Sequence, residues 1–76
     1  MGIFDAKFVG IYGAQREALH AEAYATFLRY VAKFEREGAN KSDAEEKARP
    51  LAYAEFMAAH PELRPSNVLF VLARSG

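Results

Sequence analysis

Three side chains spaced one helical turn apart are the strongest candidates for chemistry in this sequence. Arg16, His20 and Tyr24 follow one another at intervals of four residues, so a helix would place them in one row on one face. Such a row could use His20 as an acid or base and Arg16 to hold an anion. In the alternative, structural interpretation, Arg16 lies in solvent at the helix start and His20 is a boundary residue hydrogen-bonded by its neighbours. We favour the structural interpretation, because no second catalytic partner occurs at a recognisable spacing.

The other residue types argue against an enzyme, a metal site and a cofactor. The chain has no cysteine, which excludes disulfides, thiolate zinc sites and a cysteine nucleophile. Its two histidines, His20 and His60, lie far apart in the sequence. Gly10 and Gly13 lack the lysine and hydroxyl residue of a phosphate-binding loop, and they do not complete the dinucleotide-binding glycine pattern. We therefore expect no catalytic residue, no metal ligand and no cofactor.

A basic row raises the question of DNA binding. The row consists of Arg29, Lys33 and Arg36. Residues 30–48 have the outline of a helix–turn–helix unit, two helices around a glycine-containing turn. The second helix, however, would bring the acidic residues of segment 43–46 to the phosphates, and Lys plus Arg and Asp plus Glu are both 10, so the net charge is zero. A DNA-binding regulatory or packaging protein, with this row on the DNA backbone, remains the alternative function.

Two helices should position these side chains. Apolar residues recur with helical periodicity over residues 14–37, with charged residues on the opposite side, which predicts a long amphipathic helix ended by Gly38. A second helix is expected over residues 42–60, started by a capping box between Ser42 and Glu45. Pro50 lies too deep in that helix to belong to its first turn, so it predicts a kinked or split helix.

The two ends of the chain are ambiguous between helix and strand. Apolar residues in segment 3–13 have helical spacing, although part of it could form a short strand. Segment 68–73 has strand-like composition, but a strand there would need residues 7–12 or a second chain as its partner. We favour helices at both ends, the last over residues 65–74. The resulting prediction is an all-α fold, a small bundle of three to four helices that forms one domain over residues 1–76.

Apolar side chains are abundant for so short a chain. Hydrophobic residues make up 51% and aromatic residues 13% of the sequence. Fully burying one large apolar side chain contributes about 1.5–3 kcal/mol, a large share of the stability of so small a domain. We expect one copy to be too small to cover both apolar ends, which predicts an interface with another chain. The residues expected at this interface are Phe4, Phe8, Ile11, Tyr12, Val68, Leu69, Phe70 and Leu72.

We therefore expect a non-enzymatic protein–protein interaction module. In this interpretation it is a small bacterial or phage adaptor or inhibitor that occludes a site on a larger protein and self-associates as a homodimer. The alanine-rich composition favours a GC-rich bacterium or its phage. No apolar run is long enough to span a bilayer, and the first residues lack a secretory pattern, so we expect a cytoplasmic protein. Its expected partner is another protein; neither nucleic acid nor a membrane is expected as a partner.

Overall fold

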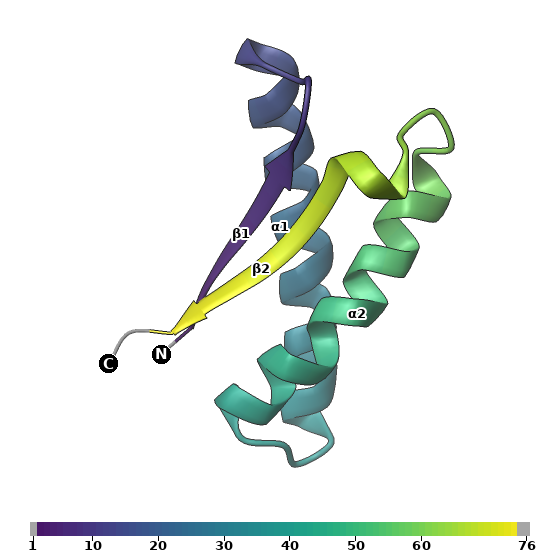
Figure 1. Cartoon of the computed structure of the whole chain (residues 1–76). Helices are drawn as coiled ribbons and strands as arrows, with labels where there is room; N and C mark the ends of the chain where they lie inside the picture. Colours follow the sequence, from purple (N-terminus) through teal and green to yellow (C-terminus); the bar gives the residue numbers. More distant parts are fainter. Residues whose placement is uncertain (1, 75–76) are drawn as a thin grey trace.

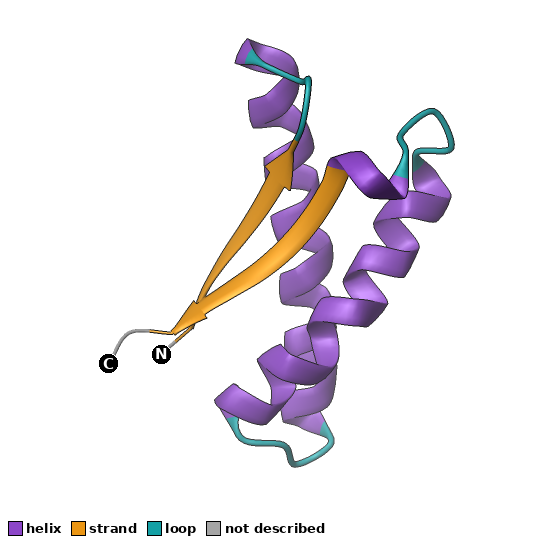
Figure 2. Ribbon diagram, in the orientation of Figure 1, coloured by secondary structure: helices purple, strands orange, loops and turns teal. Residues whose placement is uncertain are grey.

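The first and last segments of the chain pair as antiparallel strands. The computed structural model describes residues 2–74, in the order β1 (Gly2–Phe8), α1 (Gly13–Arg36), α2 (Lys41–Ala59), the short 3₁₀ turn η1 (Pro65–Asn67) and β2 (Val68–Arg74). The two helices form a hairpin that covers one face of the two-stranded sheet (Figure 1). Figure 2 shows strands at both ends, so the expected all-α bundle of three to four helices is wrong and the fold is α+β.

The two ends of the chain form strands and not the expected helices. Pairing of the two strands lets each of them bury one face. Phe4 pairs with Leu72, Ala6 with Phe70 and Phe8 with Val68. Phe4, Ala6, Phe8, Val68 and Phe70 are all buried. The residues between them point to the opposite face, since side chains alternate along a strand. A short helix over residues 65–74 would interrupt this ladder; η1 occupies only its first turn.

Aromatic rings join the sheet to both helices. The ring of Phe4 stacks on that of Phe27 of α1, with centroids 4.4 Å apart. Phe56 of α2 lies 5.6 Å from Phe70 of β2 and 5.9 Å from Phe8 of β1, measured between ring centroids. Phe27 and Phe56 are the largest fully buried side chains of the described residues. The terminal segments thus supply much of the core of a single copy.

The long helix α1 follows the predicted periodicity. Ala23, Phe27 and Val31 are buried on its inner face. Gly38 comes just after the helix with a φ of 104°, a left-handed conformation that glycine adopts without steric cost. The amide of Ala39 then donates to the carbonyl of Phe34 at 3.0 Å. The expected helix and its glycine end are confirmed.

The second helix begins earlier than predicted and is not split. Its N-cap is Asn40, whose side-chain oxygen accepts from the amide of Asp43 at 2.9 Å, in place of the predicted cap at Ser42. The helix runs through Pro50 without interruption to Ala59, because packing of its inner face compensates for the amide that proline lacks. That inner face carries small residues that bring α2 close to its neighbours: Ala44, Ala48 and Ala52. Neither helix has the length and apolar composition needed to cross a bilayer within residues 2–74.

Candidate functional site

The row Arg16, His20 and Tyr24 lines one open cleft on α1. Asp5 of β1 closes its other side, and the cleft has a volume of about 530 Å³. The Nε2 atom of His20 lies 3.4 Å from a carboxylate oxygen of Asp5, and the Nζ atom of Lys7 lies 3.3 Å from the other oxygen of the same carboxylate. All of these groups are partly exposed to water. The structure therefore brings the predicted row together and adds a carboxylate to it.

The chemistry of this cleft is that of a solvated ion network. A carboxylate beside an imidazole could orient His20 as a base, but exposed pairs of this kind contribute little energy and their groups remain hydrated. The sequence does not predict Asp5 as a member of this row, because segment 3–13 is expected to form a helix. The alternation of Phe4, Ala6 and Phe8 with charged residues is the signal that could have placed Asp5 on the outer side of a strand.

No metal-binding group is present among residues 2–74. His, Asp and Glu side chains do not gather in threes at distances suited to an ion in this part of the chain. The three residues of the basic row are exposed along α1. Arg29 forms an ion pair with Glu55 of α2, whose other oxygen accepts from the hydroxyl of Tyr30 at 2.9 Å. Lys33 lies over the ring of Phe34, 5.7 Å from its centroid. Arg36 belongs to the last turn of α1.

The residues expected at an interface divide into three groups by burial. Four are in the core of the single chain and cannot be reached by a partner without unfolding: Phe4, Phe8, Val68 and Phe70. Ile11 and Leu72 are partly buried against that core. Tyr12 and Leu69 are exposed, and the exposed fraction of Leu69 is 58%. The surface available to another chain is therefore smaller than the sequence indicates, and on β2 it is the outer face and the edge.

The free edge of β2 is defined by one backbone hydrogen bond. The amide of Val9 donates to the carbonyl of Asn67 at 2.8 Å, so the pair of Val9 and Asn67 is a hydrogen-bonded pair of the antiparallel ladder. Hydrogen-bonded pairs recur at every second residue, which makes Leu69 and Val71 the residues that bond to β1. The amides and carbonyls of Phe70 and Leu72 consequently point away from β1.

Part of this edge is already occupied by α2. The hydroxyl of Tyr53 donates to the carbonyls of both Val68 and Pro65, each 3.1 Å away. Beyond Tyr53, a groove of about 220 Å³ runs between β2 and α2; it is lined by Arg49, Pro50, Tyr53, Leu69 and Phe70. The open section of the edge is therefore short and begins at Phe70.

His60, at the end of α2, forms an ion pair with α1. Its Nε2 atom contacts the carboxylate of Glu22 on α1, and its Nδ1 atom lies 3.1 Å from the carboxylate of Glu62. Its side chain is 17% exposed, and its ring lies 4.5 Å from that of Phe56, measured between centroids. The hydrogen bond with Glu22 raises the pKa of His60 above 6.5, burial opposes this shift, and Glu62 adds to it.

We expect this contact to make stability depend on pH. Because the folded state holds the proton on His60 more tightly than the unfolded state, the stabilisation is complete below the pKa of the unfolded chain, near 6.5, and is lost as pH rises through the higher pKa of the folded protein. Urea unfolding should give a lower free energy of unfolding at mildly alkaline than at mildly acidic pH. In Glu22→Gln this difference should shrink; an undiminished difference would contradict the assignment to this pair.

Comparison with known proteins adds no assignment to these features. The chain matches no family model, no curated protein and no solved structure.

Proposed function

We propose that this protein is a non-enzymatic interaction module that self-associates through β2, so that the strands of two copies pair antiparallel and join their sheets. The observation that supports this proposal most directly is the free edge at Phe70 and Leu72, whose amides and carbonyls point away from β1. An exposed edge of this kind is a template for another strand.

The composition of the two strands favours β2 over β1 as the pairing edge. Natural sheets protect their edges with charged side chains, and β1 carries Asp5 and Lys7. In β2 the only charged residue is the last, Arg74. Leu69 is exposed beside the edge, and Leu72 is only partly covered in the single copy. A second strand laid into the groove over Pro50 would cover part of this apolar surface.

The hydrogen-bonding pattern also indicates the register. A symmetric antiparallel pair uses both Phe70 and Leu72 when Phe70 of each copy faces Leu72 of the other. Val71 then lies on the two-fold axis, opposite Val71 of the second copy, in a pair without hydrogen bonds. A register centred on Phe70 would instead require the carbonyl of Val68, which already accepts from Tyr53.

Such a dimer would act as a small adaptor. The outer face of the joined sheet would carry Leu69 and Val71 of both copies at its centre and the charged Asp5 and Lys7 at its margins. An apolar centre with a polar rim is the usual composition of a surface that binds another protein. We propose that the target of this dimer is a larger protein and that both are located in the cytoplasm.

Cysteine cross-linking tests both the dimer and its register. The chain has no cysteine, so a single Val71→Cys substitution gives one thiol per copy. Directly opposed residues in a non-hydrogen-bonded antiparallel pair have Cβ atoms about 4.5–5.5 Å apart, close enough for a disulfide with a small backbone adjustment. We expect Val71→Cys to form a covalent dimer rapidly under mild oxidation, seen on non-reducing gels.

Lys7→Cys is the matched control. It lies on the same face of the sheet but on β1, so the two thiols of the joined sheet would be at least three strand spacings, about 14 Å, apart. We expect it to remain monomeric under the same oxidation. Equal cross-linking of both variants, or sedimentation of the unmodified protein as a monomer at high concentration, would overturn the proposal.

A further inference from the structure

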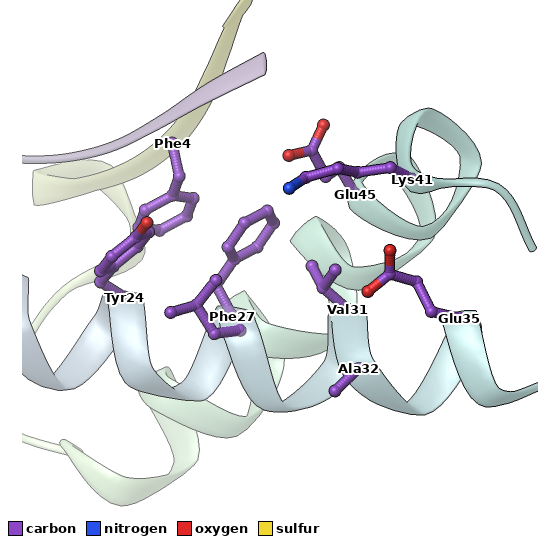
Figure 3. A pocket seen from close by; sticks show the side chains of 9 residues that line it. Phe4, Tyr24, Phe27, Val31, Ala32, Glu35, Lys41 and Glu45 are labelled. Carbon is purple, nitrogen blue, oxygen red and sulfur yellow. The ribbon is translucent and has the colours of Figure 1, made fainter. Parts of the chain in front are cut away.

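A second cleft lies between α1, the start of α2 and the first strand, away from the pairing edge. Its volume is about 350 Å³, and its apolar wall is formed by Phe4, Tyr24, Phe27, Leu28 and Val31. Figure 3 shows the rings toward one end and charged groups at the other: Glu45 and Lys41 from α2 and Glu35 from α1. The size is within the range of small-molecule sites.

Glu45 is the unusual member of this cleft. Its exposed fraction is 6%, and it is the one buried charged residue within the described part of the chain. Among the described side chains, those of residues 4–73, none forms an ion pair or hydrogen bond with its carboxylate. No side-chain oxygen there is both sealed from solvent and unpaired, so the oxygens of Glu45 must open onto the cleft. A carboxylate held in this way is costly unless a cation reaches it.

The charged side chains beside Glu45 do not neutralise its carboxylate. Lys41 precedes Glu45 by one helical turn, and its ammonium lies at the cleft (Figure 3) without forming an ion pair with Glu45 or Glu35. Lysine four residues before glutamate is the less favourable order for such a pair. Glu35 adds a second carboxylate at the same end. The charged end of the cleft is therefore net negative, while the rest of its wall is apolar.

We propose that this cleft binds a small organic ammonium ion that has an apolar stem. The ammonium group would donate to the carboxylate of Glu45, with Glu35 nearby, and the stem would lie against Phe27 and Val31. Hydrogen bonds between charged groups are among the strongest that proteins use. The site does not depend on pairing of β2, because none of its lining residues belongs to that strand.

The test titrates the full chain with 2-phenylethylammonium and, as a matched neutral probe, with 2-phenylethanol. Binding is followed by calorimetry and by the NMR signals of Phe27, Val31 and Tyr24. We expect the ammonium probe to bind at least about tenfold more tightly than the alcohol, since a hydrogen bond to a charged group is worth about that factor or more. Equal binding of the two probes, or shifts confined to other residues, would overturn the proposal.

Two variants of α2 should change the affinity in opposite directions. Glu45→Gln keeps the shape of the cleft and removes the charge, so the ammonium probe should bind about tenfold more weakly while the alcohol is unaffected. Lys41→Gln removes the competing cation and should strengthen ammonium binding. Loss of the unpaired buried charge should leave the melting temperature of Glu45→Gln unchanged or higher, which separates lost binding from lost folding. Unchanged ammonium affinity in Glu45→Gln would refute the site.

Discussion

Replacing Phe70 with glutamate is expected to unfold the protein. The side chain of Phe70 is 3% exposed. Its ring lies 5.1 Å from that of Phe4, 5.2 Å from that of Tyr53 and 5.6 Å from that of Phe56, measured between centroids. Phe70→Glu would lose these contacts and place a carboxylate among rings that offer it no partner. Each of these two effects costs several kcal/mol, and a core of this size supplies only about 3–5 kcal/mol.

The neighbouring substitution Leu69→Glu is the matched control. Leu69 lies on the same strand but points to the opposite face and is 58% exposed. We expect it to change the free energy of unfolding by about 0.5 kcal/mol or less. Far-UV circular dichroism and urea unfolding at low protein concentration, where association contributes least, measure both effects. A folded Phe70→Glu protein would show that β2 is not part of the core.

This pair of variants also shows which positions can report on partner binding. The sequence predicts that a charge at Phe70 abolishes capture of a partner, because the closing apolar run is expected to form an interface. In the structure the same charge would abolish folding first. Leu69 and Val71, which lie on the outer face, are the positions at which a substitution reports on association.

The helices could be predicted because their signals are local. In α1 the residues that are buried, Ala23, Phe27 and Val31, recur at intervals of four residues, and a glycine marks the end. The approximate extent of α2 was also predictable, although its cap was not, because Asn40 and Ser42 are both good capping residues and only the path of the preceding turn selects between them.

The strands could not be predicted with the same information. Every residue of segment 68–73 is apolar, so the alternation between buried Phe70 and exposed Leu69 leaves no trace in the pattern. The partner strand lies at the other end of the chain, and no residue pattern within either segment predicts such a long-range pairing. In residues 4–8 the alternation is visible, but the helical spacing of Phe4, Phe8 and Ile11 competes with it.

The clefts depend on the same long-range pairing. Arg16, His20 and Tyr24 share a face of one helix and were found as a row, whereas Asp5 joins them only because β1 lies along α1. The sequence predicts only a role at the helix start for Glu45, as the capping-box partner of Ser42. It becomes a buried carboxylate only when Phe4 and Phe27 are brought beside it by the packing of β1 on the two helices.

Phe56→Ala is expected to have the second largest effect on stability. Phe56 is 1% exposed, and its ring contacts those of Phe8, Phe70 and His60. It therefore connects α2 to both strands and contacts His60, which pairs with Glu22 of α1. Truncating a buried phenylalanine to alanine costs about 3–5 kcal/mol, because the transfer energy of the ring is lost and a cavity remains.

That cost approaches the whole stability of a domain of this size, so most Phe56→Ala molecules should be unfolded in the absence of denaturant. Leu51→Ala, on the same helix at a position that is 42% exposed, should remain folded and lose about 0.5 kcal/mol or little more. Urea unfolding curves and NMR signal dispersion separate the two outcomes. Equal losses in both variants would mean that α2 does not present Phe56 to the sheet. The α+β core would then have to be assembled from other contacts, because no other aromatic side chain of α2 in the described part of the chain packs against rings of both strands.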